Sequence, residues 1–261
     1  MHKKSLLFLL VHLIYLSGCI SIKSNDMIST NKKNQPQYWL KSSAFVGNFY
    51  DDDQIKLIDI KPFSTIDEAT TVDGFQLLPP PPSHIIPAGT LVKIVSISHP
   101  TLQEKLKRPL YSPRSNIWVL FQVAKERGRV NIFNPELHIL IIPQALKSDE
   151  QIKSYLARYL STHNPNQWIL KEPSHIQQAI WQKHPIVGMN KDQIEACLGS
   201  PLKKQFIKES NKNDIQELWH FDDYFIFFDK EKVIKISSLK NMAKMNENKN
   251  ALTNFQQASN S

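Results

Sequence analysis

The stretch GMNKDQIEACLGSP, residues 188–201, contains the local signals that start and stop a short helix. Asn190 stands at the N-cap position and Gln193 at the reciprocal position of a capping box, so both can satisfy free backbone N–H groups at the start of the helix. Gly199 favours the left-handed conformation that ends many helices, and the proline two residues later cannot continue one. These signals predict a helix over residues 191–198.

The segments on either side complete a small layered domain. A second short helix is expected over residues 174–183, where apolar residues recur at helical spacing. After Gly199, apolar and aromatic residues form short runs separated by turns rich in Asn and Asp, which is typical of antiparallel strands. Strands are expected at residues 202–207, 215–221 and 224–228, with room for a fourth at 233–236. Residues 173–238 are therefore predicted to form a layer of two helices and three strands.

The signature at residues 188–201 resembles that of the BamE/SmpA family of small bacterial lipoproteins. In that family, a capped helix and a Leu-Gly-x-Pro exit precede a strand with a Trp-x-Tyr pattern and then a hairpin. Here residues 219–221, Trp-His-Phe, stand in the Trp-x-Tyr place, and residues 227–233 stand for the hairpin without its usual glycine. The resemblance covers residues 174–237, about a quarter of the chain. It implies a non-catalytic role in supporting the machine that inserts β-barrel proteins into the outer membrane.

Residues 41–146 have the sequence pattern of a β-rich domain. Short apolar and β-branched runs bounded by Pro, Gly and Asn lie at 54–60, 90–97, 117–121 and 139–142. This spacing predicts a small sandwich or barrel, and residues 87–94 resemble the entry strand of bacterial SH3-like barrels. The four prolines at 79–82 must be extended. We interpret them as a stiff connector inside this domain, with a polyproline ligand as the alternative.

A helical connector is expected between the two domains, over residues 147–172. Ser148 and Gln151 have the spacing of a second capping box, and apolar residues continue at spacings of three and four. The helix should end near Thr162, before an Asn-Pro pair. The predicted fold class is α+β: a β-rich N-terminal domain, SH3-like or a small barrel, then this connector and the C-terminal layer.

Residues 1–18 have the layout of a secretory signal, with a basic start, an apolar run and small residues. The apolar run is shorter than the ~20 residues that a spanning helix needs. The LSGC sequence at residues 16–19 resembles the lipobox of bacterial lipoproteins, which implies cleavage before Cys19 and attachment of lipid to its thiol. Isoleucine, not aspartate, follows Cys19, which implies an outer-membrane location facing the periplasm. The alternative is an ordinary cleaved signal or an uncleaved anchor.

The charge of the chain suggests its surroundings. A formal charge of +8 over 261 residues favours anionic neighbours such as lipid headgroups or cell-wall polymer. No basic stripe is interleaved with aromatic residues, so nucleic acid is not an expected partner. Polar residues 19–40 are predicted to form a flexible tether, and residues 239–261 a disordered tail. The most basic stretch is interpreted as a solvated rim, with contact to headgroups or glycan as the alternative: Lys105, Lys107, Arg108, Arg114, Lys125, Arg127 and Arg129.

The sequence contains no recognisable catalytic motif. With only seven glycines it has no G-x-S-x-G, P-loop or dinucleotide-binding pattern. The acidic run at residues 51–53 lacks the glycine and closing glutamate of a calcium loop and is interpreted as a solvated turn. Cys197 lies on an apolar helical face and is interpreted as a core residue. Isolated histidines lack the spacing of zinc ligands: His84, His99, His138, His163, His175, His184 and His220. No catalytic residue, metal or cofactor is therefore expected.

These features predict a membrane-anchored, non-catalytic envelope lipoprotein. Its expected role is that of a scaffold or interaction component, in outer-membrane protein assembly or envelope integrity, with envelope proteins as partners. A module that binds peptidoglycan or another ligand through residues 41–146 is the first competing hypothesis. An inhibitor of a periplasmic hydrolase is the second, and an enzyme whose site is assembled from distant residues is the third.

Overall fold

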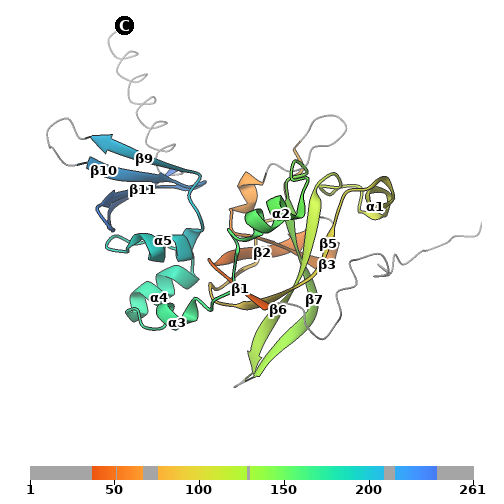
Figure 1. Ribbon diagram of the computed structural model, residues 1–261, viewed down its shortest axis with the longest axis horizontal. Coiled ribbons are helices and arrows are strands. Elements are labelled where there is room, and N and C mark those ends of the chain that lie inside the picture. The colour runs from red at the N-terminus through yellow and green to blue at the C-terminus, as the bar shows by residue number, and fades with distance from the viewer. Residues whose placement is uncertain (1–36, 51, 67–75, 128–129, 209–214, 240–261) are drawn as a thin grey trace, which may run out of the picture.

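The computed structural model describes residues 37–50, 52–66, 76–127, 130–208 and 215–239. The protein is mixed α/β, with a curled, half-barrel-like sheet, a smaller sheet and a few helices (Figure 1). The predicted signal, Cys19, most of the predicted tether and nearly all of the predicted tail lie outside the described residues. Among those that are described, no helix has the length and apolar character needed to cross a bilayer.

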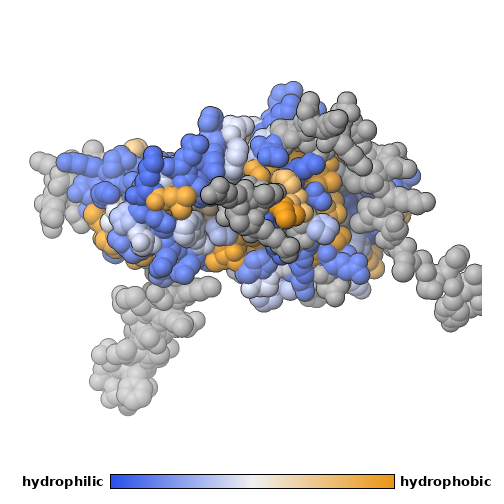
Figure 2. Space-filling model, turned by 90° about the horizontal axis from the view of Figure 1, so that it is seen from below, coloured by the Kyte–Doolittle hydropathy of each residue, from blue (hydrophilic) through white to orange (hydrophobic). Residues whose placement is uncertain are grey.

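The larger sheet has eight strands in the order β4-β2-β3-β7-β6-β5-β1-β8. The strands are β1 (Gln37–Leu40), β2 (Ala44–Phe49), β3 (Asp52–Asp59), β4 (His84–Ile86), β5 (Leu91–Ser98), β6 (Ile117–Arg127), β7 (Val130–Ile142) and β8 (Leu160–Ser161). Neighbouring strands are antiparallel except β3 and β7, which run parallel with Leu57 beside Ile139. The four predicted runs correspond to β3, β5, β6 and β7. Seen from below, hydrophobic side chains gather mainly over this sheet (Figure 2).

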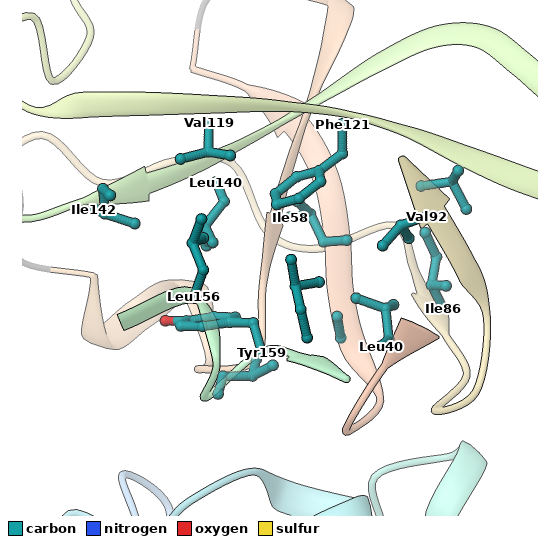
Figure 3. Packing of buried hydrophobic residues seen from close by; sticks show 14 of the residues in the cluster. Leu40, Ile58, Ile86, Val92, Val119, Phe121, Leu140, Ile142, Leu156 and Tyr159 are labelled. Atoms are coloured by element: carbon teal, nitrogen blue, oxygen red, sulfur yellow. The ribbon is translucent and has the colours of Figure 1, made fainter. Parts of the chain in front are cut away.

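The larger sheet is buried on both faces because apolar residues occupy consecutive positions in its central strands. Side chains alternate across a strand, so Val119 and Phe121 of β6 belong to one core and Trp118 and Leu120 to another. The first core also receives Leu156 from the helix that follows β7 (Figure 3). Neither face of this sheet is therefore a simple solvent-exposed layer.

Three short helical segments accompany the larger sheet: the 3₁₀ turn η1 (Phe63–Thr65), α1 (Leu102–Lys107) and α2 (Asp149–Leu156). A further short helix, α3 (Asn166–Ile169), instead buries Ile169 in the core of the C-terminal part. The expectation that the connector helix reaches Thr162 is wrong, because α2 ends at Leu156. The carbonyl of Tyr159 accepts a hydrogen bond from the N–H of Lys41 (2.8 Å), and β8 then pairs with β1. Pairing with the sheet therefore takes the chain out of the helix, and α2 packs into the first core.

The predicted tether also extends too far. Gln37–Leu40 forms β1, which pairs with β5 so that Tyr38 lies beside Val92. Local sequence could not show this pairing, because the two strands are separated by about fifty residues of other structure. The polar segment before the fold therefore ends by residue 36 rather than at residue 40.

The C-terminal part is a four-stranded antiparallel sheet with two helices packed on one face. Its elements are α4 (Ser174–Trp181), α5 (Lys191–Leu198), β9 (Lys203–Lys208), β10 (Ile215–His220), β11 (Tyr224–Asp229) and β12 (Lys232–Ser238), and the sheet order is β12-β11-β10-β9. The predicted helices and strands are confirmed, and the fourth strand is present. We call this part the second unit, and the larger sheet with α1 and α2 the first unit.

The ends of α5 follow the local signals of the sequence. The Oδ1 atom of Asn190 accepts from the N–H of Gln193 at 2.8 Å, and the Oε1 atom of Gln193 accepts from the N–H of Asn190 at 2.7 Å. Gly199 ends the helix with a φ of 93°. Beneath the helix, the rings of Trp219 and Phe228 lie 4.7 Å apart, and both are buried in the core of the second unit.

Candidate functional site

A small cleft lies where the two units meet. Its cavity volume is about 70 Å³, and its walls come from the segments that follow β3, α2, α4 and α5 and from the turn between β10 and β11. The charged and phenolic side chains in the walls include Lys61, Arg158, Tyr159, Lys183, Asp222 and Asp223. Titratable groups gathered in a cleft make it the first place to look for chemistry.

Lys183 lies just after α4 with a positive φ of 52° and is buried. Its Nζ donates hydrogen bonds to the carbonyl of Ser43, 2.7 Å away, and to the carbonyl of Cys197, 3.1 Å away. Burial lowers the pKa of Lys183 to about 8, because the charged ammonium group loses its hydration. The ammonium group therefore ties the residue before β2 to the end of α5.

Ser43 makes the complementary contacts from the first unit. Its Oγ donates to the carbonyl of Ile180 at 2.7 Å and accepts from the N–H of Ala88 at 3.0 Å, while its own N–H donates to the carbonyl of Ala196 at 3.0 Å. Buried polar groups must be paired to avoid a desolvation penalty. We call these contacts between the units the seam: Ser43, Ala88, Ile180, Lys183, Ala196 and Cys197.

Two glycines allow the seam to close. Gly89 has a φ of +81°, and a Cβ at that position would clash with the side-chain amide of Asn166. A Cβ at Gly199 would lie 2.8 Å from the Cδ1 atom of Ile60. Both positions therefore require glycine, for the backbone conformation and for the close approach of the two units.

Asp59 is a buried carboxylic acid beside the cleft. Its Oδ1 accepts from the N–H of Lys61 at 2.9 Å and from the hydroxyl of Tyr159 at 3.5 Å. Burial raises the pKa of Asp59 to about 6, although Lys61 and Lys183 act in the opposite direction. Burial also raises the pKa of Tyr159 well above its ordinary value. The pair therefore forms an acid–phenol contact at the edge of the first core.

The cleft has the features of a structural junction. Sites for small molecules typically have volumes of roughly 300–1,000 Å³, and this cavity is far smaller. Asp59 and Lys183 are both held by protein groups. Cys197 is buried and donates to the carbonyl of Ala179 at 3.4 Å, and burial raises the pKa of its thiol to about 12. The thiol stays protonated and unreactive, as the core interpretation of Cys197 predicts.

The histidines do not form a metal-binding cluster within the described residues, although His84 lies near enough to His138 to help lower the pKa of that ring. Three or more of the metal-ligating side chains His, Cys, Asp and Glu do not gather anywhere within the described residues. His138 is buried in β7, and burial lowers its pKa to about 4, so its ring is neutral near pH 7. His84 is exposed and within 2.9 Å of the Ser83 hydroxyl, and His220 lies 3.1 Å from Gln205. His99, His163, His175 and His184 are in separate segments.

The two other motifs of the first unit have structural roles where they are described. The Oδ1 atom of Asp52 accepts a hydrogen bond from the N–H of Gln54 at 2.9 Å, at the start of β3. Asp51 and the side chain of Asp53 are not among the described parts of the chain. The proline run at 79–82 packs along β2, because a Cβ at Gly47 would lie 3.2 Å from the carbonyl oxygen of Pro81. This packing supports the connector interpretation.

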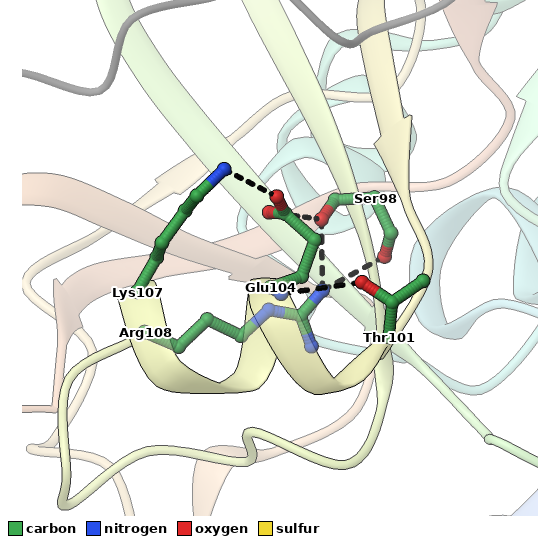
Figure 4. Close-up of polar contacts among 5 residues, drawn as sticks. All are labelled: Ser98, Thr101, Glu104, Lys107 and Arg108. Carbon is green, nitrogen blue, oxygen red and sulfur yellow. Dashed lines mark hydrogen bonds and ion pairs between the residues drawn. The ribbon is translucent and has the colours of Figure 1, made fainter.

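Arg108 departs from the predicted solvated rim. It is buried, and its guanidinium donates to the carbonyls of Ser98 (2.8 Å) and Asn116 (2.6 Å) while lying 4.2 Å from the ring centre of Trp118. Figure 4 shows this group reaching Ser98 beside α1. Burial lowers the pKa of Arg108 to about 10. Of the remaining basic residues, Lys125 is exposed, and the side chains of residues 127 and 129 are not described.

Two exposed surfaces lie away from the cleft. Strand β9 pairs only with β10 within the described part of the chain, and its Phe206 is 75% exposed. The connection between β5 and β6, residues 99–116, exposes several large apolar side chains around α1. The sequence reasoning missed both surfaces. The available signals were Leu102 and Leu106, four residues apart beside lysines, and Phe206 in a lysine-rich strand.

Comparisons of the chain with protein-family models, with curated proteins and with solved structures give no match. The resemblances to bacterial lipoproteins and to the BamE/SmpA family therefore remain predictions. Function must be argued from the chain's own surfaces.

Proposed function

We propose that this protein is a membrane-anchored, non-catalytic scaffold of the bacterial envelope. Lipid on Cys19 holds it at the outer membrane, facing the periplasm. The first unit, a small SH3-like or barrel-like body, carries a BamE-like second unit whose free strand docks an envelope protein. Confinement to the membrane raises the effective concentration of the scaffold near its partners.

The edge of β9 that has no partner strand among the described residues carries this proposal. An edge strand presents unpaired backbone N–H and C=O groups, and an extended segment of another protein can pair with them. Phe206, 75% exposed, adds an apolar anchor to this edge, and Ile207 is exposed on the opposite face of the strand. Main-chain hydrogen bonds would supply affinity, and the phenylalanine would supply specificity.

The charges along β9 favour an acidic partner segment. Lys203 is exposed, and the Nζ of Lys204 lies 3.8 Å from the ring centre of Trp219 and 3.3 Å from a carboxylate oxygen of Glu195. Lysines on an edge strand also discourage pairing between two copies of the same chain, because like charges repel. The partner of β9 is therefore an extended, acidic segment of a different protein.

The buried titratable groups around the cleft are hydrogen-bonded to other protein groups, which supports a non-catalytic role. Asp59 and Lys183 have altered pKa values of the kind seen in active sites, but their hydrogen bonds go to the seam and to Tyr159. Cys197 is a buried thiol with a raised pKa. These groups stabilise the contact between the two units and leave the outer surfaces for binding.

Site-specific crosslinking tests the docking surface. A photo-crosslinking amino acid at position 206 of the full-length protein, in cells of the source organism, should give a discrete crosslink to one envelope protein. The same probe at Leu170, 60% exposed at the end of α3, is the matched control and should give none. The partner should also lose copurification with a Phe206→Ser variant. Equal crosslinking from both positions would contradict the role of β9.

The anchor is tested separately by intact mass and membrane fractionation. The mature protein should begin at residue 19 and carry acyl chains, because several acyl chains anchor durably whereas one is marginal. Cys19→Ser should abolish the acyl mass increment. An unmodified wild-type chain would contradict the membrane-anchored scaffold.

A further inference from the structure

The connection between β5 and β6 exposes four large apolar side chains together. We call residues 99–116, which include α1, the α1 finger. The exposed fractions are 77% for Leu102, 73% for Leu106, 67% for Leu110 and 54% for Tyr111. None of the four belongs to a hydrophobic core. Scattered apolar residues are common on protein surfaces, but four within ten positions are a patch that needs a partner.

The geometry of α1 places two of these leucines side by side. Leu102 and Leu106 are separated by four residues, so they lie on the same face of the helix. Leu110 and Tyr111 follow in the segment that returns to β6. The finger therefore exposes large apolar side chains both on α1 and on the segment that returns to β6.

Two lysines border this apolar surface. The finger contains four basic side chains, but Arg108 is buried and Arg114 is hydrogen-bonded to the carbonyl of Lys105, which leaves Lys105 and Lys107 beside the leucines with one acidic side chain, Glu104. The Nζ of Lys107 lies 2.9 Å from Glu104, while Lys105 extends from the same helix. Leucines bordered by lysines are typical of segments that lie at the surface of a bilayer, with apolar groups among the acyl chains and ammonium groups among anionic headgroups.

The base of the finger is rigid. Arg108 is hydrogen-bonded to Ser98 at the end of β5 (Figure 4). It also donates to the carbonyl of Asn116 before β6, so one buried side chain holds both ends of the connection. The Nε of Arg114 donates to the carbonyl of Lys105 at 2.7 Å, and the hydroxyl of Thr101 caps α1 by accepting from the N–H of Glu104. A finger that is already ordered loses little conformational entropy on binding.

We propose that the α1 finger inserts its leucines into the interfacial region of an anionic bilayer. The inference rests on the proposed function, because an anchored protein is already held at such a surface. In Figure 1, α1 lies at the end of the larger sheet away from the second unit. Contact through the finger would therefore leave β9 free for its protein partner.

Fluorescence of the full-length protein in vesicles tests this proposal. An environment-sensitive fluorophore is attached through Gln103→Cys, an exposed position on α1, in lipid-modified protein whose acyl mass has been verified. The Cys19 thiol is then blocked by lipid, and Cys197 is buried and will not react. In phosphatidylcholine vesicles that contain phosphatidylglycerol, the emission should shift to shorter wavelength, and brominated lipid should quench it. Adding Leu102→Ser and Leu106→Ser should reduce this quenching about fivefold or more, because the apolar contact with the acyl chains is lost.

Two controls define the opposite result. Leu170→Ser removes a similarly exposed leucine outside the finger and should leave the quenching unchanged. The fluorophore at Lys171→Cys, exposed after α3, gives the baseline for a protein that is held only by its lipid. If quenching at position 103 is no greater than this baseline, the proposed insertion of the α1 finger into the bilayer is wrong. Vesicle flotation of the same samples reports the lipid anchor independently, so failure of the finger and failure of the proposed function are distinguishable.

Discussion

The two units of this protein use their sheets differently. The first unit buries both faces of an eight-stranded sheet, with Val119 and Phe121 on one side and Trp118 and Leu120 on the other. The second unit packs two helices on one face of four strands and exposes Phe206 on an unpaired edge within the described chain. A sheet buried on both faces contributes mainly to stability, whereas an open edge can bind another chain. The first unit is therefore the more closed of the two, and the proposed docking of another chain is expected at the second.

The contact between the units differs from both interiors, because it depends on buried polar bonds. The hydroxyl of Ser43 in the first unit donates to the carbonyl of Ile180, and Lys183 of the second unit donates to the carbonyl of Ser43. These bonds require both units to be folded, since an unpaired buried ammonium or hydroxyl group is costly. The two units are therefore expected to unfold together, and the following substitutions test that expectation.

The largest effect is expected from removing the central aromatic residue of the second unit. Trp219 is buried against Phe228 and donates from Nε1 to a carboxylate oxygen of Glu217 at 2.6 Å. Trp219→Ala should lower the free energy of unfolding by about 3–5 kcal/mol, because it leaves a large cavity. Chemical denaturation followed by circular dichroism gives the value.

Trp118→Ala provides the matched change in the first unit. Trp118 is also buried, in the core that contains Leu120, with the guanidinium of Arg108 4.2 Å from its ring centre. If the seam couples the units, both variants should show one shifted transition. Two separate transitions in Trp219→Ala, one unchanged from the wild-type protein, would mean that the units fold independently.

Asp59→Asn should stabilise the protein and change its pH dependence. The folded-state pKa of Asp59 is raised to about 6. The protonated carboxyl group therefore makes its full contribution to the free energy of unfolding below about pH 4, and this contribution is lost as the pH rises through 6. Tyr159, Lys61, Lys183 and Asp222 are the titratable groups that face it. Asparagine stays neutral and keeps the acceptor oxygen. The free energy of unfolding at neutral pH should therefore rise by about 1–3 kcal/mol.

The measurement is a series of urea titrations from acidic to neutral pH. Wild-type stability should fall across the window between pH 4 and 6 relative to Asp59→Asn, which should lack this component. Asp229→Asn, at an exposed carboxylate, controls for a general change in net charge and should follow the wild-type profile. An Asp59→Asn variant with the wild-type pH profile would show that Asp59 does not titrate in this range.

Ser43→Ala tests the seam with a smaller change. It removes the hydroxyl that donates to the carbonyl of Ile180 and accepts from the N–H of Ala88. Leaving these two buried groups unpaired should cost about 1–3 kcal/mol. The adjacent Ser42 is equally buried, but its Oγ has no hydrogen-bond partner within the described residues. Ser42→Ala should therefore be neutral or slightly stabilising, and an equal loss in both variants would argue against a specific seam.

The two units also differ in how far the sequence predicts them. The second unit is determined by local signals: Asn190 and Gln193 cap α5, Gly199 ends it, and short turns separate its strands. Such interactions span three to ten residues, so they can be recognised from the sequence alone. The predicted helices and strands of this unit match the structure closely.

The first unit and the surfaces depend on contacts between distant residues. The pairings of β1 with β5 and β8, and the parallel pairing of β3 with β7, join segments with no shared local signal. The basic stretch shows the same limit, because the buried guanidinium of Arg108 is paired with Ser98, ten residues before it, and Asn116, eight residues after it. Its role in the base of the α1 finger could not be recognised from charge alone.

The smallest predicted effects come from the two capping boxes, which offer a matched pair across the units. Ser148 caps α2 in the first unit, and Asn190 caps α5 in the second, with the same reciprocal glutamine three residues later. Alanine at either N-cap should cost about 1 kcal/mol. Hydrogen exchange can place the loss: Asn190→Ala should also weaken protection at the seam, because α5 supplies the carbonyls of Ala196 and Cys197, whereas Ser148→Ala should not. Equal effects on the seam would mean that α2 and α5 support the contact alike, against the assignment of the seam to α5.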